Sequence, residues 1–239
     1  MTEIFWLEQK TCDAPASDDW LSGSECARLA TLRFPKRRED WRLGRWTAKQ
    51  AVAAFLGLPS GPGDLAEIEI RPAPSGAPEV FLADRPAPVS ISLSHRAGTG
   101  LCAIAPPDTQ FGCDLEVVEP RPFSFFQEYF TVEEQALVLR AAPAERDRLI
   151  TLLWSAKESV LKALRVGLRA ATNAVSVCPV AGGRIQDWRT FYGRNSTGRV
   201  FDGWWRETPD LLRTVAAGSG IINRVSFEPM RIASGVHKP

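Results

Sequence analysis

The chain has 239 residues, of which 44% are apolar and 24% are charged, so it can bury a sizeable core and is globular rather than disordered or fibrous. Its 29 basic residues nearly balance its 28 acidic ones, so there is no bulk field that would indicate nucleic-acid or membrane binding. The five cysteines are scattered without a C-x-x-C spacing, and only two histidines occur. These counts favour reduced thiols and argue against a zinc site built from histidines.

The first residues, MTEIFWLEQKTCD, show no basic-then-apolar signal pattern. The sequence also has no apolar run near the ~20 residues that a membrane-spanning helix needs. We therefore expect a soluble, cytoplasmic protein.

Helical and strand patterns alternate along the chain. A helical pattern covers 24–56 and ends at Gly57. A second helix is predicted over 129–142, where Thr131 and Glu134 form a capping-box pattern, and a third runs from about 145 to 164 with Gly167 as its stop. Strands are predicted at 65–71, 80–83, 89–94, 101–105 and 111–118, then through 170–222 with a hairpin at 204–218.

Two segments resemble each other. Residues 41–58 (WRLGRWTAKQAVAAFLGL) and 154–168 (WSAKESVLKALRVGL) both run from Trp through basic residues and an apolar helix to Gly-Leu. A duplication would give two similar α+β halves, 1–108 and 109–239, joined near Pro106–Gln110. The match is short, so chance similarity is the alternative.

The strand FGCDLEVV places two carboxylates on one face. With a period of two, Phe111, Cys113 and Leu115 share one face, and Asp114 and Glu116 project together from the other. A solvated outer face is the simple interpretation. The alternative is a Mg²⁺ site, because carboxylates without histidine or thiolate suit that ion.

Lys157 is an unexpected cation in the helix LLWSAKESVLKAL. At about 100° per residue it falls about 40° from Leu153, inside the apolar stripe. Either the side chain reaches solvent, or it needs an anion, because an unpaired buried charge is costly. Glu158 and Lys162 lie one turn apart and could form an ordinary i,i+4 pair.

Two further features could contact an anion. Arg45 falls about 40° from Trp41, at the edge of the apolar stripe of the first helix, so both similar segments place a cation near their core face. Ser94-His95 ends a strand with glycines beyond, which fits either a structural histidine or a phosphate cradle.

Together these motifs resemble the 4′-phosphopantetheinyl transferase superfamily, specifically the surfactin (Sfp-like) pseudo-dimeric type. The family pattern is a strand G-x-D-x-E and, some forty residues later, a helix W-x-x-K-E-x-x-x-K. Here they stand as Gly112-Cys113-Asp114-Leu115-Glu116 and as Trp154 through Lys162. The resemblance covers about Arg28 to Ala217 and includes the Ser-His pair after a strand.

The resemblance implies an α+β fold of two halves, with coenzyme A in the cleft between them. It implies transfer of the phosphopantetheine arm of coenzyme A to a serine of an acyl or peptidyl carrier protein, with release of 3′,5′-ADP, by a monomer. Mg²⁺ would be held by Asp114, Glu116 and Glu158, and catalysis would involve Glu158 and Lys162. Coenzyme A would contact the following residues: Arg28, Arg45, Arg71, Ser94, His95, Lys157 and Lys162.

The chain departs from the family pattern in three places. Ser75-Gly76-Ala77-Pro78 stands where members often have G-K-P, so a lysine contact is missing, and Arg71 or Arg85 could replace it. Arg96 follows the Ser-His pair, and Leu115 separates the two carboxylates.

Two other functions remain open: a non-catalytic relative that binds coenzyme A or a carrier protein, and a Mg²⁺-dependent phosphoester hydrolase. The segment 122–126 (PFSFF) is a candidate carrier-docking patch, and core packing is its alternative interpretation.

Overall fold

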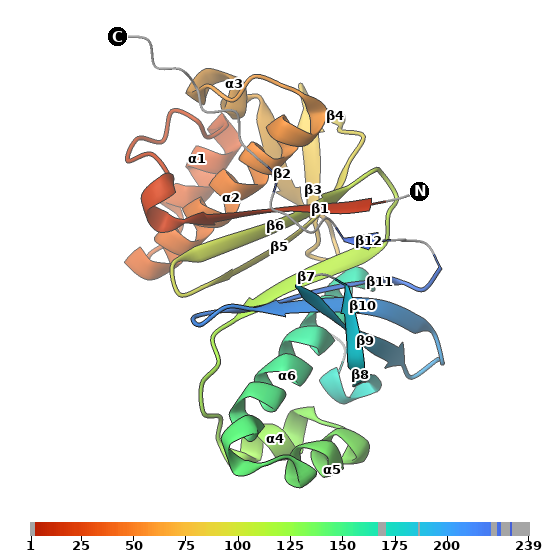
Figure 1. Cartoon of the computed structure of the whole chain (residues 1–239). Coiled ribbons are helices and arrows are strands. Elements are labelled where there is room, and N and C mark those ends of the chain that lie inside the picture. Colours follow the sequence, from red (N-terminus) through yellow and green to blue (C-terminus); the bar gives the residue numbers. More distant parts are fainter. Residues whose placement is uncertain (1–2, 167–170, 186, 221–223, 226–229, 231–239) are drawn as a thin grey trace.

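The computed structural model describes residues 3–166, 171–185, 187–220, 224–225 and 230, with backbone only at 184–185 and 224–225 (Figure 1). It has an α+β fold in which each of two sheets is covered by one long helix. Within these residues, no helix combines the length and apolar character needed to cross a membrane.

The first half is built around the helix α2 and a sheet with the strand order β12-β1-β6-β5. A smaller sheet, β2-β3-β4, lies beside it. The elements of this half are β1 (Glu3–Lys10), α1 (Gly23–Ala30), α2 (Pro35–Leu56), α3 (Pro62–Ala66), β2 (Ile68–Pro72), β3 (Pro78–Leu82), β4 (Arg85–Pro86), β5 (Ser90–Arg96) and β6 (Thr99–Ala105).

The second half is built around the helix α6 and an antiparallel sheet with the order β7-β11-β10-β9-β8. Its elements are β7 (Phe111–Glu116), α4 (Phe123–Tyr129), α5 (Val132–Arg140), α6 (Arg146–Ala163), β8 (Val175–Ile185), β9 (Trp188–Asn195), β10 (Val200–Glu207) and β11 (Leu212–Gly218). The last strand, β12 (Arg224–Val225), returns to the first half and pairs in parallel with β1.

The sequence predicts many of these elements but not α3, α4 or β4, and it differs from the structure in two further features. The helix expected over 24–56 is two helices, because the chain is extended at Phe34 before Pro35 opens α2 at a position that needs no N–H donor. The N-terminal strand β1, which pairs with β6 over six residues, was not predicted. Gly57 does end α2, in the left-handed conformation at φ 66°.

The hydrophobic core has three parts. One lies under α2 and one under α6. The third lies between the two sheets and includes Trp6 from β1 and Trp188 from β9, whose rings meet edge to face at 5.9 Å. This apolar interface fixes the two halves against each other, so that side chains from both can line a common site.

Each half contains the same buried ion pair. In the first half the ammonium of Lys49 lies 2.5 Å from Glu25, and in the second the ammonium of Lys157 lies 2.7 Å from Glu134. Both lysine side chains are fully buried. Each glutamate belongs to the capping box that starts a short helix, α1 or α5.

The hydrogen bonds around the two pairs also match. Each lysine donates to two backbone carbonyls, and each glutamate accepts a backbone N–H from a neighbouring strand. The acceptors are Trp20 and Leu65 for Lys49, and Thr172 and Val175 for Lys157; the strand donors are Ile70 and Val177.

The residue that matches Lys157 is therefore Lys49, four residues beyond Arg45. Trp46-Thr47-Ala48-Lys49 in α2 corresponds to Trp154-Ser155-Ala156-Lys157 in α6. The matching ion pairs thus align Trp154 with Trp46, five residues after the Trp41 that begins the similar segment in the sequence.

Candidate functional site

The site is built where β7 crosses α6. A Cβ at Gly112 would lie 2.2 Å from the carbonyl oxygen of Ser159 and 2.6 Å from the amide nitrogen of Ala163, so only glycine lets the strand approach the helix backbone this closely. This contact brings the carboxylates of β7 beside Glu158 and Lys162 of α6. Gly112 thus shapes the site because it has no side chain to hold the strand and the helix apart.

Asp114 lies at the centre of a polar network. Its side chain is buried, and it accepts hydrogen bonds from Ser94 at 2.8 Å, from Ser155 at 2.9 Å and from the ammonium of Lys162 at 2.9 Å. Ser94 comes from β5 in the first half, whereas Ser155 and Lys162 come from α6. The face that carries Asp114 is therefore interior, which excludes the solvated interpretation of this strand face.

Glu116 is held by three donors. The indole N–H of Trp154 donates to one oxygen at 3.0 Å, and Arg121 donates to the other at 3.1 Å. Arg96 forms an ion pair with the same carboxylate at 3.4 Å and also contacts Glu119. Burial, followed by the charge of Asp114, raises the pKa of Glu116 despite the two arginines.

Glu158 is the acid of the cluster whose carboxylate is least satisfied. Its Oε1 atom is buried without a hydrogen-bond partner among the described residues. Burial is the main reason that its pKa rises to about 7, and the carboxylates of Asp114 and Glu116 add to the effect. A buried acceptor beside two further acids is an environment that a cation would relieve.

Lys162 is the cation inside this cluster. It donates to Asp114 and to the carbonyl of Cys113, both at 2.9 Å. Burial disfavours its charge, but the attraction of Asp114 outweighs this effect, and the pKa of the ammonium is raised. Lys162 therefore stays protonated at neutral pH.

The donor set Asp114, Glu116 and Glu158 fits a hard divalent cation, because it offers carboxylate oxygens and one unsatisfied buried acceptor. Within the part of the chain that the structure describes, however, no three acidic, histidine or cysteine side chains converge as metal ligands. In this conformation Asp114 is paired with Lys162 instead, and Glu116 is paired with Arg96 and Arg121.

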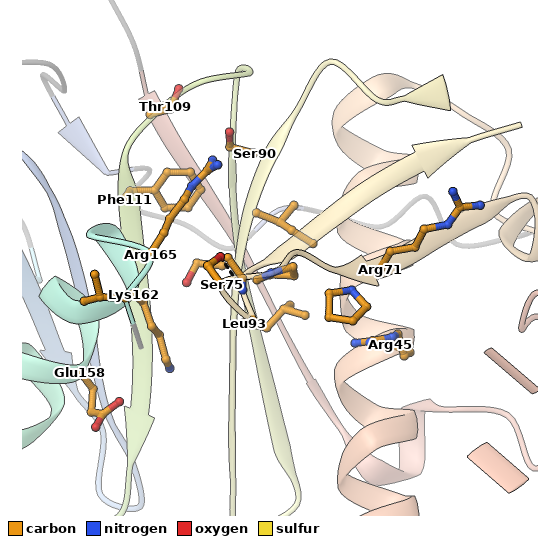
Figure 2. Close-up of a pocket in the computed structure, with 17 residues that line it drawn as sticks. Arg45, Arg71, Ser75, Ser90, Leu93, Thr109, Phe111, Glu158, Lys162 and Arg165 are labelled. Carbon is orange, nitrogen blue, oxygen red and sulfur yellow. Dashed lines mark hydrogen bonds between the residues drawn. The ribbon is translucent and has the colours of Figure 1, made fainter. Parts of the chain in front are cut away.

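A pocket of about 690 Å³ opens beside this cluster, between the two halves. Figure 2 shows Glu158 and Lys162 on one side of it and Arg45 and Arg71 on the other. Besides Glu158, Lys162 and Phe111 of the second half, its wall includes the segment 75–78 and the strand residues 90–93. Glu158 is the one acid that lines it among the described residues, against four basic side chains, so the pocket suits an anionic ligand.

The predicted ligand-binding residues are only partly brought together. Arg45 and Arg71 line the pocket. Arg28 is exposed on α1 and donates to Thr31; it does not line the pocket itself but lies within electrostatic range of Arg45, which does. Ser94 is committed to Asp114, and the exposed imidazole of His95 lies at the end of β5, within electrostatic range of Asp114.

Lys157 needs a correction. Its predicted burial is confirmed, since none of its side chain is exposed. Its counter-charge is Glu134, however, and its remaining hydrogen bonds go to Thr172 and Val175, so the ammonium does not face the pocket. Burial lowers the pKa of Lys157, and Glu134 opposes this effect. This lysine belongs to the fold.

Of the two suggested replacements for the missing lysine at 75–78, only Arg71 lines the pocket. Arg71 is paired with Glu69 and Asp84, and Arg85 is exposed on β4 away from the pocket wall.

Sequence reasoning missed several residues that shape the site. Trp154 was recognised as part of a motif but not as the donor to Glu116, and Ser155 was not recognised as a donor to Asp114. Arg121, which lies in the loop after β7, gave no periodic signal. The repeated tetrapeptides WTAK and WSAK were the available signal for the buried lysines.

Comparison with known proteins shows what the segment carrying this site resembles. Residues 110–196 match the family model described as the 4′-phosphopantetheinyl transferase superfamily. The 4′-phosphopantetheinyl transferase HetI of Nostoc sp. is 28% identical over 152 residues, which cover 62% of this chain and 61% of HetI. The protein slr0495 of Synechocystis sp., provisionally named for the same activity, is 25% identical over 67% of this chain and 63% of its own length.

The chain thus spans about six-tenths of the length of these curated relatives. A holo-(acyl-carrier-protein) synthase from Bacillus anthracis, solved with CoA (3′,5′-ADP), is 19% identical over 44% of this chain and 97% of its own, with a TM-score of 0.37, a likeness too weak to support a conclusion. The matched segment contains β7 and α6, the two elements that carry the acidic cluster. Residues 110–196 are therefore similar to the 4′-phosphopantetheinyl transferase superfamily, and the two curated relatives are named for that activity.

Proposed function

We propose that this protein transfers the 4′-phosphopantetheine arm of coenzyme A to a serine hydroxyl of an acyl or peptidyl carrier protein and releases 3′,5′-ADP. The observation that carries the proposal is the acidic cluster of Asp114, Glu116 and Glu158 at the edge of a basic pocket. The names of the two relatives support the same activity.

The acidic cluster would hold Mg²⁺ through Asp114, Glu116 and Glu158. When bound, the ion would polarise the diphosphate of coenzyme A and stabilise the charge on the departing nucleotide. The unsatisfied oxygen of Glu158 and the mutual repulsion of the three acids support this assignment.

In the transfer step, the serine oxygen forms a bond to the phosphorus that carries the pantetheine arm. The bridging P–O bond of the diphosphate breaks, and 3′,5′-ADP leaves with the electron pair. Glu158 is the nearest candidate to accept the serine proton, directly or through a water. Lys162, which stays protonated, neutralises charge on the leaving phosphate.

We also infer that the chain is a duplication with a pseudo-twofold axis between halves at 1–108 and 109–239. The matching ion pairs of Lys49 with Glu25 and of Lys157 with Glu134 support this inference. Because the two halves already enclose the pocket within one chain, we propose that the active form is a cytoplasmic monomer.

The carrier protein would dock on α4 and α5, beside the acidic cluster. Three apolar side chains are exposed there, Phe123 at 65%, Val132 at 77% and Leu139 at 56%. Of the other phenylalanines in the segment 122–126, Phe126 is buried and Phe125 packs on Trp154, so core packing accounts for these two. The docking proposal therefore rests on Phe123, Val132 and Leu139.

The test is to incubate the protein with coenzyme A, Mg²⁺ and an apo carrier protein and to measure the intact mass of the carrier. A phosphopantetheine adduct is the expected result. Unmodified carrier with intact coenzyme A would instead indicate a non-catalytic binding protein, and cleaved coenzyme A with unmodified carrier would indicate a hydrolase.

A further inference from the structure

Arg165 occupies an unusual backbone position at the end of α6. The helix ends at Ala163, and Arg165 follows in the left-handed conformation with φ 56°. Its amide donates to the carbonyl of Lys162 at 2.9 Å, and the next amide, of Val166, donates to Leu161 at 3.3 Å. Glycine is the residue that ends helices in this conformation at least cost, so the backbone does not explain an arginine here.

The side chain of Arg165 lines the pocket and is exposed there. No hydrogen bond or ion pair joins its guanidinium to any other described residue. The other three cations of the pocket wall all have acidic partners: Arg45 with Glu25, Arg71 with Glu69 and Asp84, and Lys162 with Asp114. Arg165 is thus the cation of the described pocket wall that keeps its five donors for a ligand.

Arg165 lies away from the acidic cluster. It follows Glu158 by seven residues, which corresponds to about 10 Å along a helix. Figure 2 shows the two side chains extending from α6 in different directions, with Lys162 between them. A ligand whose diphosphate lies near Glu158 could therefore reach Arg165 in one of two ways. It could place a second charged group there, or its diphosphate could extend from Glu158 to Arg165.

We propose that Arg165 is a substrate-binding residue that contacts a phosphate group of coenzyme A through its free guanidinium in the pocket. The inference rests on the function proposed above. A planar guanidinium forms paired, charge-assisted hydrogen bonds with phosphate oxygens. Two phosphates of coenzyme A could supply the oxygens, the diphosphate or the 3′-phosphate of the ribose, and the experiment distinguishes them.

The experiment measures binding of coenzyme A and of 3′-dephospho-coenzyme A by calorimetry, for the wild type, Arg165→Gly and Arg165→Lys. Glycine suits the left-handed backbone, so the glycine variant should melt at the same temperature or higher. Loss of a charged hydrogen bond should weaken its affinity for coenzyme A about tenfold to a hundredfold, with lysine intermediate. Arg140→Ala, which removes an exposed arginine from α5 outside the pocket, is the control for net charge.

A loss confined to coenzyme A assigns the contact to the 3′-phosphate, whereas an equal loss with both ligands assigns it to the diphosphate. Wild-type affinity in Arg165→Gly, or an equal loss in Arg140→Ala, would overturn the inference while leaving the proposed function intact. A wild-type protein that does not bind coenzyme A overturns the proposed function, and the inference with it.

Discussion

Replacing Lys157 with methionine tests whether this lysine serves the fold or the ligand. The substitution keeps the length of the side chain and removes the ammonium, which lies 2.7 Å from Glu134 and is fully buried. Glu134 then keeps its hydrogen bonds from the amides of Thr131 and Val177, but its charge is left buried without a counter-ion.

Breaking a buried ion pair by removing one partner costs about 3–5 kcal/mol. We expect Lys157→Met to lose that much free energy of unfolding. The double variant Lys157→Met with Glu134→Gln should recover part of the loss, by about 1–3 kcal/mol, because no charge remains buried. The recovery should be incomplete, since the carbonyls of Thr172 and Val175 lose their donor.

The assay is urea denaturation at pH 7 for the wild type and both variants, followed by titration of coenzyme A below the unfolding transition. Lys49→Met is the matched comparison in the first half. It should lose a similar free energy of unfolding, because Lys49 is also fully buried and forms an ion pair with a glutamate. Unchanged stability in Lys157→Met, together with weakened binding of coenzyme A, would refute the structural role and restore the phosphate contact expected from the sequence.

Two further predictions follow from the acidic cluster and the strand crossing. The pKa of Glu158 is raised from 4.5 to about 7, so folding favours the protonated form of this carboxyl group. The contribution of that form to the free energy of unfolding is fully present below pH 4.5 and is lost as the pH rises through 7. Glu158→Gln should therefore gain about 1–2 kcal/mol at pH 8, after allowance for solvent screening of a half-buried group, and nothing at pH 4.5. Equal urea midpoints at pH 8 would contradict this assignment. Gly112→Ala should lose about 1–3 kcal/mol or more, because the new methyl group would meet the backbone of Ser159, whereas Gly63→Ala, with open space around it, should not. Thermal melts of these two alanine variants measure the difference in stability, and equal melting temperatures would disprove the packing argument.

Local patterns predicted each half of the acidic cluster, and the family resemblance supplied the expectation that the halves meet. Asp114 and Glu116 share one strand face by period two, and Glu158 and Lys162 share a helix flank. The crossing of β7 and α6, which unites the two pairs, depends on the missing side chain at Gly112.

The partner of Lys157 could not be predicted, because Glu134 lies 23 residues earlier on another helix. A helical wheel reports that a position is buried and leaves open what it meets there. The same holds for β1, whose place in the sheet depends on pairing with β6 about ninety residues later in the chain. Long-range pairing of this kind leaves no periodic trace in a single sequence.

The most direct test of the proposed function is the intact mass of an apo carrier protein after incubation with coenzyme A and Mg²⁺, with the wild type and Glu158→Gln measured side by side. We predict a phosphopantetheine adduct with the wild type and unmodified carrier with the folded variant. Unmodified carrier with the wild type, or full modification by Glu158→Gln, would contradict the account.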